Sequence, residues 1–287
     1  MKEIPFYKMQ GAGNDFVVLD NRELGLKPEQ FSALAKQVCT RRMSVGADGL
    51  MIADAPEHGG DLKLWFYNAD GSMGEMCGNG ARCIGRFGYE HFAQKSPVTI
   101  EATSGDVLAW RIDEQQYRIR LNEPTVLDVL HPATGLGGES RVCSYVELGD
   151  PGLPHAVLPR PGLSHLDYQR DLFALGKALR HAREFPKGAN VNFCSIVGPG
   201  EIVVRTYERG VENFTLACGT GSAATVVAMQ ARALLPKEGP VKVHNPGGVL
   251  TVEVVWDGDT VTELYLTGPT NIISKGVITD EELHLED

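Results

Sequence analysis

Met76-Cys77-Gly78-Asn79-Gly80 has a second copy in this sequence, Ala217-Cys218-Gly219-Thr220-Gly221, which lies 141 positions further on. The repetition extends outward from this pair through four blocks in the same order. Residues 13–19 match 152–158, residues 46–48 match 188–190, residues 65–80 match 205–221, and residues 98–100 match 241–243. Blocks repeated at nearly one offset indicate a duplicated structural unit. We therefore expect two halves with one fold, which face each other across a pseudo-twofold axis.

Each half contains both strand and helix patterns. Alternating β-branched stretches predict strands at 98–102, 107–112, 117–121, 202–207, 249–256 and 261–266. Helical spacing of apolar residues predicts helices at 28–40, 81–93, 169–182 and 222–234. Several strands and two helices in each half predict an α+β fold.

The boundary between the halves is expected near residues 122–124, where a strand ends at a proline. Residues 267–287 have no counterpart at the end of the first half. We expect them to cross back and complete it. The predicted domains are thus residues 1–121 with 267–287, containing Cys77, and residues 122–266, containing Cys218.

Composition excludes several classes of partner. Among the 287 residues, Lys and Arg number 27 against 37 Asp and Glu, and no stretch concentrates the basic residues. Nucleic acid and anionic membranes are therefore poor candidates. No segment has the ~20 apolar residues that span a bilayer, and the first residues lack the apolar core of a signal peptide. We expect a cytoplasmic protein whose partner is a small molecule.

The six cysteines are better interpreted as thiols than as a disulfide framework. None stands in a C-x-x-C pair, and the eight histidines have no ligand-like spacing to them, so we expect no metal site. Most buried cysteines act as small apolar residues, and this interpretation is kept for Cys39, Cys83, Cys143 and Cys194.

Cys77 and Cys218 differ because each follows a strand and a turn and precedes a predicted helix. Unpaired N–H groups and the helix dipole stabilise an anion at such a position, so the thiol can ionise. A thiolate on one face of an sp3 carbon removes its proton, and a thiol on the other face returns one with inverted configuration. The pair therefore predicts epimerisation of an amino acid without a cofactor. A disulfide between the two cysteines is the rival interpretation.

The glycines beside each cysteine let the backbone approach a ligand closely. The N–H groups of Gly78, Asn79, Gly219 and Thr220 are therefore predicted to hold the substrate carboxylate. Because an α-hydrogen is only weakly acidic, two such helix starts would have to supply electrostatic stabilisation of the carbanion.

With these motifs the sequence resembles the diaminopimelate epimerase family. The matching segments follow the family order over nearly the whole chain, and they are residues 8–16, 45–49, 67–72, 75–83, 207–210 and 217–221. The resemblance implies two similar lobes, each a mixed sheet wrapped around helices, with the site between them. It implies conversion of LL-2,6-diaminopimelate to the meso form, no cofactor, and a homodimer.

The resemblance also implies residue roles. Cys77 and Cys218 would be the bases, and the amino and carboxylate groups of the substrate would be bound by Asn14, Asn68, Asn190, Glu208 and Arg209. A substrate with two ammonium and two carboxylate groups needs both acceptors and a forked donor.

Three departures from the family pattern bear on the substrate. Leu153 stands where many members have asparagine, Gly49 where many have glutamine, and residues 211–215 form a stretch one residue longer than usual. A racemase or epimerase for another amino acid on the same scaffold therefore remains an alternative. A non-catalytic amino-acid-binding protein and a thiol-disulfide redox protein are alternatives from other classes. His155, beside Pro154, is interpreted as a structural residue rather than a third acid-base group.

Overall fold

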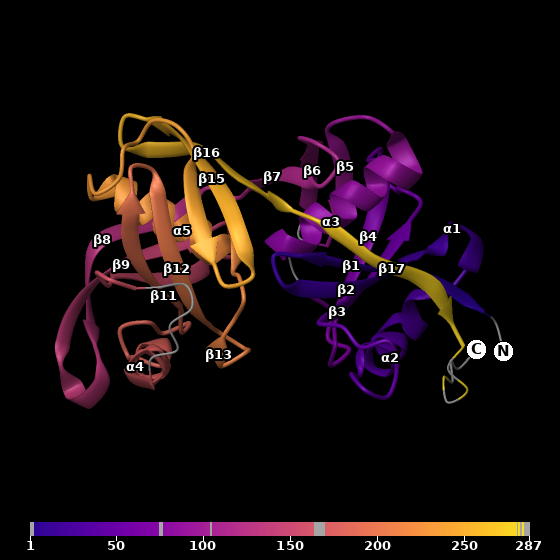
Figure 1. Ribbon diagram of the computed structural model, residues 1–287, viewed down its shortest axis with the longest axis horizontal. Coiled ribbons are helices and arrows are strands. Elements are labelled where there is room, and N and C mark those ends of the chain that lie inside the picture. Colours follow the sequence, from indigo (N-terminus) through magenta and orange to yellow (C-terminus); the bar gives the residue numbers. More distant parts are fainter. Residues whose placement is uncertain are drawn as a thin grey trace. The chain divides into compact units, whose positions relative to one another are not determined.

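A computed structural model describes residues 3–74, 77–103, 105–163, 170–279, 281 and 283. The chain divides into two compact units (Figure 1). Unit 1 comprises Met1–Ile119 and Gly268–Asp287, and unit 2 comprises Arg120–Thr267. Both units combine strands and helices, so the α+β prediction is confirmed.

In the described part of unit 1, eight strands pair in the order β17-β1-β2-β3-β4-β5-β6-β7. Neighbours are antiparallel except at β2–β3 and β4–β5, which are parallel. Their bounds are β1 Ile4–Gly11, β2 Asn14–Asp20, β3 Gly49–Asp54, β4 Leu62–Asn68, β5 Val98–Ala102, β6 Gly105–Arg111, β7 Gln116–Leu121 and β17 Asn271–Ile278.

Unit 2 has the same arrangement in its described part, in the order β8-β9-β10-β11-β12-β14-β15-β16. Its parallel pairs, β10–β11 and β12–β14, occupy the same places in the order. The bounds are β8 Pro124–Thr134, β9 Ser140–Leu148, β10 Leu153–Pro159, β11 Asn190–Gly198, β12 Glu201–Glu208, β13 Asn213–Phe214, which pairs with β12, β14 Val241–Asn245, β15 Gly248–Asp257 and β16 Thr260–Pro269. Shared order and direction confirm the internal repeat.

Strand register corrects one detail of the repeat. In unit 1 Phe16 lies opposite Gly49, and in unit 2 the corresponding His155 lies opposite Asn190. Gly49 is therefore the structural counterpart of Asn190. The sequence match had paired Asn190 with Asp48, because the preceding Gly-Ala pairs align one residue out of step with the strands.

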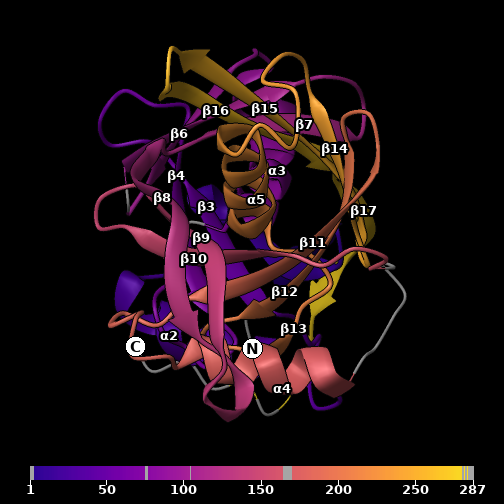
Figure 2. The ribbon, with the colours of Figure 1, turned by 90° about the vertical axis from the view of Figure 1, so that its left-hand side faces the viewer.

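The strands of each unit surround one central helix. These helices are α3, Gly78–Gly88, in unit 1 and α5, Gly219–Ala231, in unit 2. The described side chains of both are almost entirely buried. α3 packs on β1, β2, β3, β5 and β6, and Figure 2 shows α5 surrounded by the strands of its own unit. A helix buried on all sides favours small or apolar side chains, which explains the Gly and Ala residues of both helices. Asn79 and Arg82 of α3 are polar exceptions. Each helix starts three residues before its predicted start.

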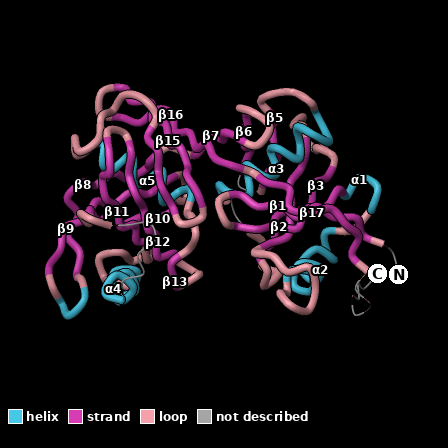
Figure 3. Tube along the Cα trace, viewed as in Figure 1, coloured by secondary structure: helices cyan, strands magenta, loops and turns pink. Residues whose placement is uncertain are grey.

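A second helix covers the outside of each sheet (Figure 3). α2, Pro28–Cys39, packs on β3 and β4, while α4, Arg170–Arg180, packs on β11 and β12. α2 buries Phe31, Leu34 and Val38 and exposes its polar face. Gln169, the predicted first residue of α4, lies outside the described residues.

Three short helical segments were not predicted as separate elements. They are α1, Asn21–Leu24, the π-helical turn η1, Tyr89–Ala93, and the 3-10 turn η2, Leu136–Gly138. Because η1 follows α3 directly, the predicted helix over 81–93 is two segments with different hydrogen bonding.

β17 pairs with β1 along its whole length, from Ile4 opposite Ile278 to Gln10 opposite Asn271 (Figure 1). Ile4 and Ile278 are both buried in the same apolar cluster. Residues after unit 2 thus supply the edge strand of unit 1. Among the described residues, no helix combines the length and the apolar character needed to cross a membrane.

Candidate active site

The two cysteines occupy the same backbone position in their units. Cys77 is the N-cap of α3, with φ −110° and ψ 115°, and Cys218 is the N-cap of α5, with φ −110° and ψ 112°. Cys77 is half-buried and Cys218 is buried, and all six cysteines of the chain are thiols rather than disulfides. Each sulfur therefore belongs to a residue at the positive end of a helix.

The Cys218 sulfur is held by its own helix start. Its Sγ accepts a hydrogen bond from the Gly221 N–H at 3.3 Å and lies 3.6 Å from Thr220 Oγ1. The hydrogen bond donated by the Gly221 N–H favours the thiolate over the thiol.

A buried polar network lies against this helix start. Thr206 Oγ1 donates to Asn192 Oδ1 at 2.8 Å, and Asn192 Nδ2 lies 3.4 Å from His155 Nδ1. A Cβ added at Gly221 would come within 2.3 Å of Asn192 Oδ1, so the helix approaches the network this closely only with glycine there. The corresponding unit 1 residues, by strand register, are the apolar Phe16, Met51 and Phe66.

His155 is neutral at physiological pH. Burial, together with the positive charge of Arg209, lowers the pKa of His155 to about 3. Its side chain is fully buried. A group that cannot take up a proton near neutral pH is a poor general base, so the structural interpretation of His155 fits.

In unit 1 the predicted carboxylate site is tied to a predicted substrate-binding residue. Asn79 Nδ2 donates to Asn14 Oδ1 at 2.5 Å, and Asn14 Nδ2 donates to Asp48 Oδ2 at 3.2 Å. These bonds fix which end of each amide faces which neighbour. Asn14 stands at the start of β2 and Asn79 in the first turn of α3, so the bonds also join strand to helix.

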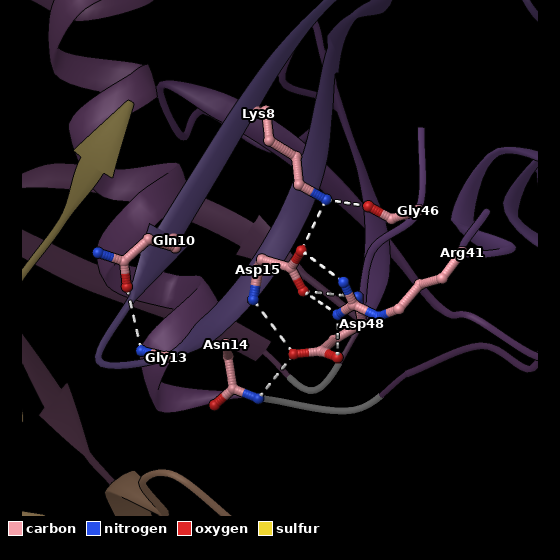
Figure 4. A network of polar contacts seen from close by, with 8 residues as sticks. All are labelled: Lys8, Gln10, Gly13, Asn14, Asp15, Arg41, Gly46 and Asp48. Atoms are coloured by element: carbon pink, nitrogen blue, oxygen red, sulfur yellow. Dashed lines mark hydrogen bonds and ion pairs between the residues drawn. The ribbon is translucent and has the colours of Figure 1, made fainter. Parts of the chain in front are cut away.

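Asp48 belongs to a cluster of charges that the sequence analysis did not single out (Figure 4). Arg41 bridges Asp15 at 2.5 Å and Asp48 at 3.0 Å, and Lys8 pairs with Asp15 at 2.7 Å. Although burial raises the pKa of Asp15, the hydrogen bonds from Arg41 and Lys8 lower it below its ordinary value. Lys8, Asp15 and Asp48 all lie inside segments that match the family, which was the signal available.

Asn68 is exposed at the end of β4, opposite Gly49. Its Nδ2 donates to Ser72 Oγ at 3.0 Å. It thus lies at the same end of the sheet as Asn14, since the starts of β2 and β3 and the end of β4 are neighbours.

The three predicted residues of unit 2 lie together. Asn190 begins β11 and Glu208 ends the neighbouring β12, followed by Arg209. Asn190 Oδ1 accepts the Arg209 backbone N–H at 2.8 Å, and Arg209 Nη1 donates to the Lys187 carbonyl at 3.1 Å. Glu208 and Arg209 are half-buried.

Two of the family departures lie at strand starts where the other unit has an asparagine. Leu153 begins β10, where unit 1 has Asn14, and Gly49 begins β3, where unit 2 has Asn190. Each sheet therefore presents an asparagine at only one of these two places. Within the described residues no three His, Cys, Asp or Glu side chains are arranged to hold a metal ion.

Comparison with known proteins decides the family. The model of the family described as diaminopimelate epimerase matches residues 6–126 and 149–273. The chain belongs to the diaminopimelate epimerase family. A diaminopimelate epimerase of Aquifex aeolicus is 36% identical over 97% of this chain and 99% of the relative. One from Methanothermobacter thermautotrophicus is 34% identical over 96% and 98%.

Solved structures with the same fold are more distant. A Bacillus anthracis phenazine biosynthesis protein of the PhzF family has a TM-score of 0.69 at 13% identity, covering 96% of this chain and 99% of that chain. A hydroxyproline epimerase from Agrobacterium vitis has a TM-score of 0.68 at 14% identity, covering 98% and 94%. These structures confirm the predicted fold class. Membership of the diaminopimelate epimerase family confirms the resemblance and the assignment to the isomerases.

Proposed function

We propose that this protein converts LL-2,6-diaminopimelate to meso-diaminopimelate without a cofactor, with Cys77 and Cys218 as the paired base and acid. One observation carries the mechanism: the two thiols are N-caps of equivalent buried helices with nearly identical backbone angles. The family membership supports the substrate, because the relatives bear this name.

The mechanism needs one thiolate and one thiol. The thiolate of one cysteine takes the α-proton, and the carbon becomes a planar carbanion. The other thiol then donates its proton to the opposite face, so the two sulfurs exchange protonation states in each turnover. The N–H groups of Gly78, Asn79, Gly219 and Thr220 stabilise the charge that develops on the carboxylate.

The remaining proposed residues bind the rest of the substrate. Glu208 and the oxygens of Asn14, Asn68 and Asn190 accept from its ammonium groups, while Arg209 pairs with the distal carboxylate. We also propose that the protein is cytoplasmic and forms a homodimer. Sedimentation of the purified protein measures its oligomeric state.

The test is solvent isotope exchange. In deuterated water with LL-diaminopimelate, the wild-type protein should form the meso isomer with deuterium at the inverted carbon. Cys77→Ser and Cys218→Ser should each lose about a hundredfold or more in kcat, because each removes one acid-base group. Cys39→Ala is the matched control, since burial raises the pKa of Cys39 to about 12 and keeps it a thiol. Full activity in either serine variant would refute the mechanism.

A racemase for another amino acid is the second candidate. It is favoured by Leu153 and Gly49, which leave the starts of β10 and β3 without the polar side chains expected there. Incubation with a panel of amino acids in deuterated water separates the two. α-Deuteration of another amino acid, with none in diaminopimelate, would replace the first proposal. A protein that binds diaminopimelate without any exchange would be a binding protein instead.

A further inference from the structure

Arg82 is a fully buried cation in the second turn of α3. Its Nη1 donates to the Gly78 carbonyl at 3.1 Å and its Nη2 donates to Asn79 Oδ1 at 2.8 Å. Its Nε has no hydrogen-bond partner, and the ion pairs of the described residues include no carboxylate for it. Buried charges are normally paired, so the absence of a carboxylate needs an explanation.

The geometry directs this charge toward the start of the helix. Side chains on a helix lean toward its N-terminus, and the Arg82 fork accordingly reaches the first two residues after Cys77. Gly11 of β1 covers the guanidinium: a Cβ there would lie 2.9 Å from the Asn79 carbonyl oxygen and 3.5 Å from Arg82 Nη2. Strand and helix together therefore close the cation off from water.

Two thiols interact electrostatically with Arg82, namely Cys83 and Cys77. Cys83 is fully buried, and burial raises its pKa to about 12, so it stays neutral. Burial lowers the pKa of Arg82 itself to about 10, which still leaves the guanidinium charged at neutral pH. Of the two thiols, only Cys77 can supply the compensating negative charge.

The other charged groups on elements packed against α3 are engaged elsewhere. Lys8, Asp15, Arg41 and Asp48 form a cluster with two charges of each sign. The remaining groups and their surroundings are Asp20 with Arg22, Asp54 with Asn21, Arg86 with Glu90, Glu101 with the N–H groups of residues 57, 58 and 60, the exposed Asp106, Arg111 over the Tyr89 ring, and His91 against the Phe87 ring.

We propose that Arg82 is a positioning residue that holds Cys77 as a thiolate through its buried charge and aims the Asn79 side chain through its fork. The first part concerns the protein alone, and the second rests on the proposed function. A directed chain of hydrogen bonds starts at the Arg82 guanidinium: Arg82 donates to Asn79, Asn79 donates to Asn14, and Asn14 donates to Asp48. Arg82 thereby sets the orientation of two proposed substrate-binding amides. In unit 2 the corresponding residue is Ala223, so the device belongs to one cysteine only.

The test of the charge uses alkylation in a Cys218→Ser background. Iodoacetamide modification of Cys77 is followed by mass spectrometry from pH 5 to 10, which gives the pH midpoint of its reactivity. In the otherwise unchanged protein we expect a midpoint below the ordinary cysteine value of about 8.5. Arg82→Met should raise the midpoint by about one pH unit or more, because an opposite charge is lost. Arg82→Lys keeps the charge and should keep the low midpoint.

Arg86→Met is the matched control. It removes an arginine one turn further along α3 whose partner is Glu90, so the Cys77 midpoint should stay in place. A merely structural role for Arg82 would lower the melting temperature of Arg82→Met without moving that midpoint. Arg82→Gln repeats the test if the methionine variant fails to fold.

The test of the fork uses steady-state kinetics with both cysteines present. Lysine cannot make the planar pair of bonds, so Arg82→Lys should raise KM for diaminopimelate while largely retaining kcat. Arg82→Met should lose kcat at neutral pH and regain part of it as the pH rises toward the new midpoint.

Two results would overturn the proposal. One is a Cys77 midpoint at or above the ordinary cysteine value in the Cys218→Ser protein that retains Arg82. This measurement needs no Arg82 variant, so it can be made even if every such variant unfolds. The other is an unchanged midpoint in folded Arg82→Met or Arg82→Gln. Because alkylation needs no substrate, a failure of epimerisation with the expected midpoints would count against the proposed function alone.

Discussion

At the scale of single residues, the polar side chains behind the two cysteines distinguish otherwise equivalent sites. At the helix start of Cys218, Gly221 lies against Asn192, which contacts Thr206 and His155. The helix start at Cys77 has apolar residues at the corresponding positions and a buried arginine beside it. A duplicated fold therefore surrounds its two thiols with different chemistry.

His155 makes stability depend on pH. Its pKa rises from about 3 in the folded protein to an ordinary 6.5 on unfolding, so the unfolded chain takes up a proton below pH 6.5 that the folded protein does not. The contribution of neutral His155 to the free energy of unfolding is complete above pH 6.5 and is lost progressively as the pH falls toward 3. Between pH 7 and pH 5 this histidine should cost about 2 kcal/mol of unfolding free energy.

Urea unfolding at the two pH values measures this loss. His155→Gln should remove about that part of the pH dependence, whatever its own effect on stability. His58→Gln, at an exposed histidine, is the control and should keep the wild-type slope. Equal pH slopes for wild type and His155→Gln would show that His155 takes up its proton within the folded protein.

The sequence could predict the residues that recur in both halves, but not the buried residues that pack around them. Cys77 and Cys218 were found because both copies sit in glycine contexts before apolar helices. Arg82 lies in the same motif, yet a charged residue in a helical pattern is ordinarily exposed, and its burial depends on Gly11 from a strand far away in the sequence. The roles assigned to the substrate-binding residues remain predictions.

At the scale of elements, the central helices are positioned by missing side chains. A Cβ added at Gly85 would lie 2.5 Å from the Ala109 Cβ of β6, a contact that neither side can relieve by rotating a bond. Gly85→Ala should therefore push α3 away from β6 and destabilise unit 1 by about 1–3 kcal/mol.

The compensating variant tests the cause. Gly85→Ala combined with Ala109→Gly restores the space and should recover much of the lost stability in urea unfolding, apart from the cost of glycine in a strand. If the double variant is as unstable as the sum of the two single variants, the loss arises elsewhere than in this contact.

Element prediction from the sequence succeeded where periodicity was strong. The strands expected at 98–102 and 117–121 and the helix expected at 28–40 agree with β5, β7 and α2 within one residue at each end. The starts of α3 and α5 were placed three residues late, because glycine at 78, 80, 219 and 221 is unfavourable in an isolated helix. Burial inside a sheet reverses that preference, since only small residues fit there.

At the scale of the whole molecule, unit 1 depends on a strand from beyond unit 2. Ending the chain after Pro269 removes β17, its hydrogen bonds to β1 and the buried Ile278. We expect this truncation to lower the urea midpoint of unit 1 by about 1 M or more, while unit 2 keeps its own midpoint.

Tryptophan fluorescence can follow the two units separately. Trp65 and Trp110 lie in unit 1, and Trp256 lies in unit 2, where its Nε1 donates to Gln230 Oε1 at 2.9 Å. With both unit 1 tryptophans replaced by Phe, the remaining signal reports unit 2 alone. A chain ended after Thr279 keeps β17 and is the control. A Trp256 transition that shifts as far as the unit 1 transition would mean that the units unfold together.

The pairing of β17 with β1 also orders events during translation. When a ribosome has delivered residues 1–119, the edge of β1 still lacks the neighbour that will cover it, and all of unit 2 emerges before that neighbour is made. The nascent amino-terminal sheet therefore waits with an open edge, the kind of surface on which chains associate with one another. Unit 2, continuous in the chain, can finish folding first, so newly made molecules of this protein mature from the middle outward.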